Sequence, residues 1–123
     1  MAEQIRTAVV GAGYFGRFHA NHYSKNPDAK LVAVVDADAD RAKAVADEFG
    51  AEAVTDHRQI LDRVDAVSIA VPTPLHFEVA RELIAAGLHV LIEKPITDTV
   101  ESAKAITALA EERGTVLQVG HIE

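Results

Sequence analysis

Cysteine and tryptophan are absent from this chain of 123 residues. Without cysteine the protein has no disulfides, thiolate metal ligands or cysteine nucleophiles, and cysteine usage gives no clue to its redox compartment. Aromatic residues make up only 5% of the chain, and 12 basic residues stand against 19 acidic ones, for a formal net charge of -7. Because the lysines and arginines are scattered along the sequence, we expect no nucleic-acid partner.

Long hydrophobic runs are missing too. No apolar run approaches the length that spans a bilayer, and the segment Met1–Gln4 lacks the basic start and apolar stretch of a signal peptide. We therefore expect a cytoplasmic protein with no membrane partner. An apolar fraction of 49% in 123 residues is enough for one buried core and too little for two ordinary domains. We expect residues 1–123 to form one domain.

Short β-branched runs alternate with longer amphipathic segments along the chain, a pattern typical of a parallel sheet with helices on both faces. Six strands are predicted, at residues 5–10, 31–35, 52–54, 66–71, 89–92 and 115–120. Helices are predicted at residues 14–24, through 42–49, at 75–86, and from Asp98, where Glu101 completes a capping box, to about Arg113. Right-handed crossovers then give an α/β doubly wound Rossmann fold with strand order 3-2-1-4-5-6.

A GxGxxG motif occupies residues 11–16, directly after the first predicted strand and at the start of the first helix. In that context the motif predicts a loop that binds the pyrophosphate of a dinucleotide. Gly11 permits the tight turn, Gly13 lets the backbone approach the pyrophosphate, and Gly16 lets the helix pack closely on the sheet. The alternative is a tight turn between strand and helix with no ligand.

Aromatic side chains follow the second glycine of the motif. The backbone amides of Tyr14 and Phe15 are placed to reach the pyrophosphate, while their side chains pack against the protein or cover the cofactor. Packing is the simpler interpretation. We expect Phe15, Phe18 and Tyr23 to pack the helix against its neighbours.

Two histidines in the same helix raise the question of a metal. His19 and His22 are three residues apart and could share one helix face. The sequence suggests no third ligand nearby. We therefore predict no metal site.

Asp36 ends the second predicted strand, twenty residues beyond Gly16, where its carboxylate can accept hydrogen bonds from the adenosine ribose. Its charge would repel a 2′-phosphate, which favours NAD over NADP. Asp36 could instead cap the next helix, a task that Asp38 or Asp40 could do equally well. Arg41 points toward NADP, because an arginine near this strand end accommodates a 2′-phosphate in some dinucleotide-binding proteins.

Ligands of open α/β sheets bind beyond the carboxyl ends of the strands, so the segments that end or follow strands four, five and six are candidates for chemistry. These segments are Val71–His76, Glu93–Pro95 and Gly120–Glu123. The Glu-Lys-Pro motif after the fifth strand and the Gly-His pair that ends the sixth carry a resemblance over the whole chain. The sequence resembles the N-terminal domain of the glucose-fructose oxidoreductase and inositol 2-dehydrogenase (Gfo/Idh/MocA) family.

The resemblance implies an NAD-dependent oxidoreductase that transfers a hydride between nicotinamide and the hydroxyl of a sugar, sugar nucleotide or polyol. The lysine of the family motif lies beside the nicotinamide and the reacting carbon, which implies a catalytic role in proton transfer for Lys94. The chemistry is reasonable, because hydride loss from a carbinol requires loss of the hydroxyl proton, and a lysine of lowered pKa can take it. Glu93 is implied to orient the loop or contact the cofactor. A cis peptide is implied at Pro95, with an ordinary trans turn as the alternative.

The segment after the fourth strand departs from the family pattern. Val71 stands where a threonine is commoner, and Thr73 comes after Pro72. We expect Val71, Pro72 and Thr73 to contact the cofactor. His76 either lines the nicotinamide end of the cleft or is a polar surface residue. His121 resembles the family's Gly-His ending near the substrate.

In the family a second α/β domain supplies most substrate contacts, and we find no such C-terminal substrate domain within residues 1–123. We therefore predict that this chain binds NAD and has little or no dehydrogenase activity alone. Surface normally covered by the second domain would be exposed, which is compatible with an apolar patch and a homodimer formed through it.

Two alternatives belong to other functional classes. One is a stand-alone NAD-binding sensor or regulatory module in which Lys94 has no catalytic role. The other is a Rossmann-like methyltransferase, which also pairs a glycine loop with an acidic residue after the second strand. The Glu-Lys-Pro motif and the six-strand pattern weigh against the methyltransferase.

Overall fold

A computed structural model describes residues 4–93 and 99–120. Its strands are β1 (Ile5–Val10), β2 (Ala29–Val35), β3 (Glu52–Val54), β4 (Ala66–Ile69), β5 (His89–Glu93) and β6 (Leu117–Gly120). Its α-helices are α1 (Tyr14–Lys25), α2 (Ala39–Phe49), α3 (His76–Ala85) and α4 (Val100–Arg113). Two short 3-10 helices are η1 (His57–Ile60) and η2 (Thr73–Leu75).

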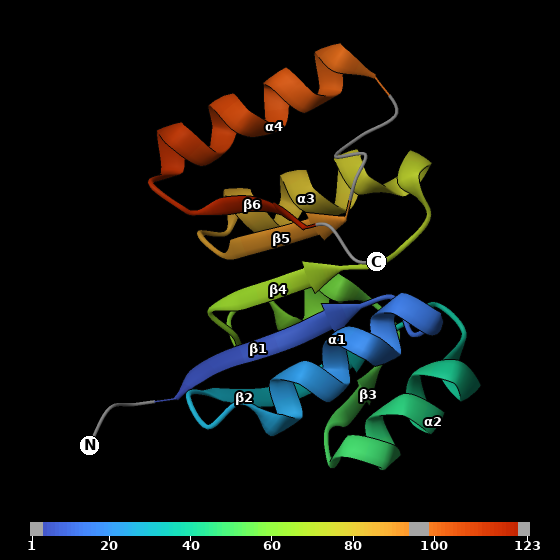
Figure 1. The fold of residues 1–123 in the computed structure, drawn as a ribbon. Coiled ribbons are helices and arrows are strands. Elements are labelled where there is room, and N and C mark those ends of the chain that lie inside the picture. Colours follow the sequence, from blue (N-terminus) through green and yellow to red (C-terminus); the bar gives the residue numbers. More distant parts are fainter. Residues whose placement is uncertain (1–3, 94–98, 121–123) are drawn as a thin grey trace.

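The six strands form one sheet in the order β3-β2-β1-β4-β5-β6, and every neighbouring pair is parallel. Helices α1 and α2 lie beside the β1–β3 half, and α3 and α4 beside the β4–β6 half (Figure 1). This arrangement confirms the predicted doubly wound Rossmann fold. Its carboxyl edge is therefore the place where the loops after all the strands meet.

Neighbouring residues of β1 belong to two different hydrophobic clusters, because successive side chains of a strand point to opposite faces of the sheet. Val9 packs in a cluster with Ala20 of α1 and Val45 of α2. Val10 packs in a larger cluster with Leu83 of α3 and Ile106 of α4. The sheet is thus covered by helices on both faces, as the continuous apolarity of its strands predicts.

Several element boundaries differ from the sequence prediction. β4 ends at Ile69 and β6 begins at Leu117, so both strands are shorter than predicted. α3 begins at His76, one residue later than predicted, because Leu75 belongs to the 3-10 helix η2, whose Leu75 amide donates a hydrogen bond to the Pro72 carbonyl. The 3-10 helix η1, between β3 and β4, was not predicted at all.

The start of α4 also differs. The N-cap is Thr99, whose hydroxyl accepts a hydrogen bond from the Ser102 amide, and the helix begins at Val100. The predicted cap, Asp98, lies outside the described residues. Gly114 ends the helix in the left-handed conformation, as the sequence predicts for a C-terminal glycine.

The prediction for the packing of α1 is wrong for two of its three aromatic residues. Phe15 and Phe18 are 47% and 39% exposed, and the buried face of the helix is formed by Gly16, His19 and Ala20. This face thus carries one glycine, one histidine and one alanine, and neither phenylalanine belongs to it. Tyr23 is partly buried as predicted, and its hydroxyl is hydrogen-bonded to the Ser68 hydroxyl of β4.

The described ranges contain no helix that is both long and apolar enough to cross a membrane.

Candidate functional site

The loops after β1, β2, β3 and β4 enclose a cleft of about 1080 Å³ at the carboxyl edge of the sheet. Eight of the site residues predicted from the sequence line this cleft: Gly11, Gly13, Phe15, Asp36, Val71, Pro72, Thr73 and His76. Arg41 lines it as well. The size is that of a site for a large organic ligand.

The first and third glycines of the motif are required by the loop itself. Gly11 has a φ of 107°, and a Cβ there would lie 2.6 Å from the Ala70 carbonyl oxygen of the neighbouring strand end. A Cβ on Gly16 would overlap the carbonyl oxygen of Gly11. Gly16 thus packs against the loop it closes, and the close approach predicted for it is made to Gly11 as well as to the sheet.

Gly13 differs from these two glycines, because nothing lies within 4 Å of the position where its Cβ would stand. It is the N-cap of α1, so this helix has no capping side chain, and its first turn contains no acidic residue. The backbone amides at this end and the helix dipole favour an anion. The open space at Gly13 therefore fits a phosphate group held against the helix N-terminus.

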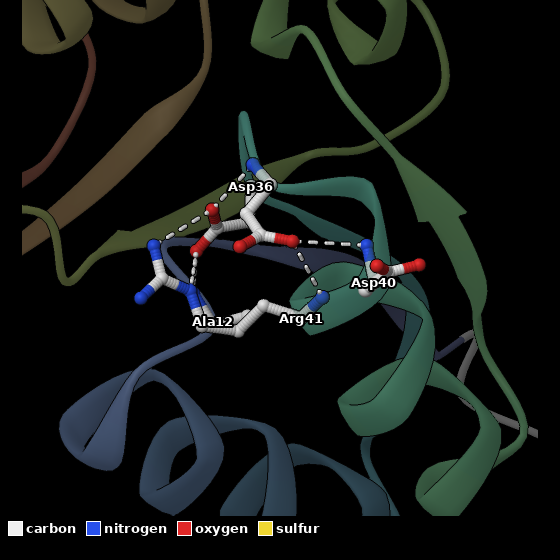
Figure 2. Close-up of polar contacts among 5 residues, drawn as sticks. Ala12, Asp36, Asp40 and Arg41 are labelled. Carbon is white, nitrogen blue, oxygen red and sulfur yellow. Dashed lines mark hydrogen bonds and ion pairs between the residues drawn. The ribbon is translucent and has the colours of Figure 1, made fainter.

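Asp36 follows β2, and its side chain is only 8% exposed. Its Oδ2 accepts hydrogen bonds from the Ala12 amide at 2.8 Å and from Arg41 Nε at 3.2 Å. Its Oδ1 accepts from the Asp38 amide at 2.8 Å and from Arg41 Nη2 at 3.2 Å. Figure 2 shows these groups converging on the carboxylate. Asp36 thus ties the glycine loop to the start of α2.

The electrostatics of this carboxylate favour its ionised form. Burial opposes ionisation of Asp36, but the amides of Ala12 and Asp38 and the guanidinium of Arg41 outweigh it and lower the pKa of the carboxyl below its ordinary value. The same contact raises the pKa of Arg41. At neutral pH the cleft therefore presents a carboxylate at the end of β2.

The cap of α2 is Asp38 and neither of the other two candidates. Its Oδ1 accepts hydrogen bonds from the amides of Asp40 and Arg41, each at 3.1 Å (Figure 2). Asp36 lies outside the helix cap and faces the cleft. The position is compatible with the predicted contact to a ribose.

His76 lines the cleft, and the surface alternative for it is wrong, since the residue is 2% exposed. Its Nε2 lies 2.8 Å from the carbonyl oxygen of Val71. Because a carbonyl can only accept, Nε2 carries the proton and donates it. This hydrogen bond links the start of α3 to the backbone just before η2. Val71 and Thr73 line the cleft together with His76.

Four polar cleft residues were missed by the sequence analysis: Thr55, Asp56, His57 and Arg58. Asp56 caps η1 through the Arg58 amide, and Arg58 Nε donates to Glu82 of α3 at 2.8 Å. Burial opposes ionisation of Glu82, but Arg58 and His57 lower its pKa overall. These residues follow β3, so the rule applied to strands four to six would have found them if applied to strand three.

Some predicted site residues cannot be placed. Lys94, Pro95 and His121 lie outside the described residues. Glu93 ends β5 and pairs with Gly120 of β6, so both strands end at the same edge of the sheet as the cleft.

The histidine pair of α1 is split by its surroundings. His19 is buried, whereas His22 is exposed and packs edge-on against Phe18 at a ring distance of 4.9 Å. In the part of the chain that the structure describes, no group of three metal-ligating side chains is found.

Comparison with known proteins gives relatives over nearly the whole chain. It is 45% identical over 119 residues to the UDP-N-acetylglucosamine 3-dehydrogenase of Acidithiobacillus ferrooxidans, covering 97% of this chain and 37% of that protein. The solved structure of that enzyme superposes with a TM-score of 0.91, at 44% identity over 95% of this chain and 38% of that one.

Two further solved structures hold nicotinamide cofactors. GenD2 from gentamicin A biosynthesis, in complex with NAD, matches with a TM-score of 0.94 and 38% identity over 98% of this chain and 35% of that one. KijD10, a 3-ketoreductase from Actinomadura kijaniata in complex with NADP, matches with a TM-score of 0.89 and 33% identity over 95% of this chain and 38% of that one.

This chain therefore spans a little over a third of the length of these relatives. The family model described as "Oxidoreductase family, NAD-binding Rossmann fold" matches residues 5–121. The chain belongs to the Gfo/Idh/MocA oxidoreductase family and corresponds to the NAD-binding Rossmann-fold domain of its members.

Proposed function

We propose that this chain binds NAD, in preference to NADP, as the cofactor domain of an oxidoreductase acting on a sugar, sugar-nucleotide or polyol hydroxyl. Residues 1–123 form that domain, and alone they have little or no dehydrogenase activity. The chemistry that a bound nicotinamide supplies is acceptance of a hydride from a carbinol carbon and its return in the reverse reaction.

The observation that carries the proposal is the Asp36 carboxylate at the end of β2, tied to the glycine loop through the Ala12 amide. In this position a carboxylate can accept hydrogen bonds from ribose hydroxyls and repels a 2′-phosphate. The open backbone at Gly13 supplies the neighbouring phosphate position. Together they fit the adenosine and pyrophosphate parts of NAD.

In the proposed reaction Lys94 takes or returns the hydroxyl proton at its Nζ, following the role of the lysine in the family motif. Val71, Pro72 and Thr73 wall the cleft at the end of β4, where they exclude water from the nicotinamide side. Two of the relatives named above are a UDP-N-acetylglucosamine 3-dehydrogenase and a 3-ketoreductase. These names support a sugar-type substrate. In our proposal most substrate contacts come from a part of the enzyme that corresponds to the region of the relatives outside the match to this chain.

Calorimetric titration of the chain with NAD, NADP and S-adenosylmethionine tests the proposal. We expect binding of NAD, weaker binding of NADP and none of S-adenosylmethionine. Asp36→Ala should weaken NAD binding about tenfold to a hundredfold, because it removes hydrogen bonds to a charged group worth about 1.5–3 kcal/mol.

Asp62→Ala is the matched control, since it removes one exposed carboxylate that does not line the cleft. A folded chain that binds no dinucleotide, or that binds S-adenosylmethionine instead, would contradict the proposal. Substantial dehydrogenase turnover by this chain alone with a sugar substrate would contradict the proposed lack of activity.

A further inference from the structure

The Asp36 carboxylate has no acceptor position left for a ribose. An ionised carboxylate offers about four lone-pair sites, two on each oxygen. Here Oδ1 and Oδ2 each accept one backbone amide and one guanidinium nitrogen, which makes four hydrogen bonds in all. A ribose that binds Asp36 through its 2′- and 3′-hydroxyls must displace two of these donors.

The backbone donors cannot be the ones that leave. The Ala12 amide belongs to the glycine loop, which Gly11 and Gly16 lock by close packing. The Asp38 amide belongs to the N-cap residue of α2. Displacing either amide would open the loop or the helix start that forms the site.

Arg41 is the donor that can move. Its side chain is 58% exposed, whereas Asp36 is 8% exposed. Its own backbone amide is held by Asp38 Oδ1 at 3.1 Å, so the guanidinium can swing while the backbone stays in place (Figure 2). Both Arg41–Asp36 hydrogen bonds are 3.2 Å long, against 2.8 Å for the two amide bonds.

We infer that Arg41 competes with the ribose for Asp36 and thereby reduces the discrimination between NAD and NADP that the Asp36 carboxylate sets. This inference rests on the proposed function. The free chain holds the guanidinium on the carboxylate, and NAD displaces it. A 2′-phosphate, in contrast, gives the guanidinium a second anion to bridge, so that Arg41 offsets the repulsion from Asp36 instead of opposing the ligand.

The opposite effects on the two ligands give a sharp test by calorimetric titration of Arg41→Ala with NAD and with NADP. NAD binding should tighten about two- to fivefold, the effect of removing one exposed competing ion pair. NADP binding should weaken about tenfold or more, because a charge-assisted contact is lost. The ratio of the two dissociation constants should therefore rise roughly twentyfold or more.

Two further variants separate the competition from a general change of charge or fold. Lys43→Ala removes one positive charge from the same helix, but Lys43 pairs with Asp47 and does not line the cleft, so both affinities should stay unchanged. Arg41→Lys keeps the charge and loses the two-nitrogen fork, so it should tighten NAD binding while retaining part of the NADP binding. Thermal unfolding of each variant verifies that it is folded.

The outcomes separate this inference from the proposed function. If the wild-type chain binds no dinucleotide, the proposed function fails and the inference fails with it. If the wild type binds NAD but Arg41→Ala weakens NAD and NADP equally, or changes neither, the site stands and the competition is wrong. A twentyfold rise in discrimination that Lys43→Ala does not reproduce supports it.

Discussion

The polar side chains of the two halves of the sheet have different tasks. In the first half, β1–β3 with α1 and α2, the Asp36 network joins the glycine loop to α2 and faces the cleft. In the second half, β4–β6 with α3 and α4, the polar side chains of His76 and His89 form hydrogen bonds within that half. His76 is hydrogen-bonded to the Val71 carbonyl, and His89 Nδ1 accepts a hydrogen bond from the Val116 amide. The first half is thus organised for a ligand, and the described part of the second half for its own structure.

The difference teaches where binding free energy arises. The glycine loop, the N-terminus of α1 and the Asp36 carboxylate are in place before the ligand arrives, so only the exposed Arg41 side chain has to move and little free energy is lost to ordering. By that argument we expect the adenosine end of NAD to supply most of the affinity and the nicotinamide end to add little in this chain. The predictions below test this asymmetry, from the largest expected effect to the smallest.

Leu83→Ala should separate stability from binding. Leu83 is fully buried in the cluster beneath α3, so its truncation should lower the free energy of unfolding by about 2–5 kcal/mol. The affinity of the remaining folded chain for NAD should stay within about twofold, because the residue belongs to the second-half scaffold. Urea denaturation and calorimetry measure the two quantities.

Val100→Ala is the control in the same half, since this residue is 70% exposed, and it should change the free energy of unfolding by about 0.5 kcal/mol or less. A tenfold loss of NAD affinity in folded Leu83→Ala would mean that the halves are coupled and that the comparison is wrong.

Two glycines of the same loop should give opposite results. Gly16→Ala should lower the free energy of unfolding by about 1–3 kcal/mol or more, because its Cβ would overlap the Gly11 carbonyl. Gly13→Ala should cost no more than about 1 kcal/mol, an N-cap effect, since the space around its Cβ is open. It should nevertheless weaken NAD binding at least about tenfold, because the methyl group occupies the space of the pyrophosphate. Tight NAD binding by Gly13→Ala would place the phosphates elsewhere.

The side-chain caps of α2 and α4 form a matched pair across the halves. Asp38→Ala and Thr99→Ala each remove an N-cap, of α2 and α4, and each should lower the free energy of unfolding by about 1 kcal/mol. Only Asp38→Ala should change the affinity for NAD, because Asp38 holds the backbone of Arg41 and its own amide bonds to Asp36. Equal changes of NAD affinity in both variants would remove the distinction between the halves.

The pH dependence of Asp36 should be the smallest effect. Because the folded-state pKa of Asp36 is lowered from its ordinary value of 3.8, its ionisation adds stability that is fully present above that pH. The contribution is lost as the pH falls from 3.8 through the lower folded-state pKa. Denaturation of wild type and Asp36→Asn across this range should show their stability difference shrinking toward acid pH.

Asp47→Asn serves as the control, because this carboxylate is 64% exposed and its surface ion pair contributes little, so the variant should differ little from the wild type in stability. A stability difference for Asp36→Asn that stays constant through the acid range would mean that the carboxylate is not stabilised in the folded state.

The sequence predicts the sheet order and the glycine loop because both follow from strong local rules. The alternation of strands and helices leaves one topology under right-handed crossovers, and Gly11 and Gly16 occupy positions that admit no side chain. Local spacing does not single out the Asp38 cap, because Asp36 and Asp40 fit the sequence equally well.

What the sequence cannot predict depends on packing between distant elements. Phe15 and Phe18 are apolar but exposed, because Gly16, His19 and Ala20 form the buried face of α1. His76 turns inward because η2 brings the Val71 carbonyl within 2.8 Å, which residue type alone does not reveal. The saturation of Asp36 needs three segments at once, and only the folded chain brings them together.

Titration of this chain with two fragments of NAD tests the asymmetry most directly. ADP-ribose lacks only the nicotinamide and nicotinamide mononucleotide lacks the adenosine monophosphate, and each is measured separately against NAD by calorimetry. We expect ADP-ribose to bind within about threefold of NAD and nicotinamide mononucleotide not to bind measurably. Binding of nicotinamide mononucleotide as tight as that of NAD, or failure of ADP-ribose to bind where NAD does, would contradict the account.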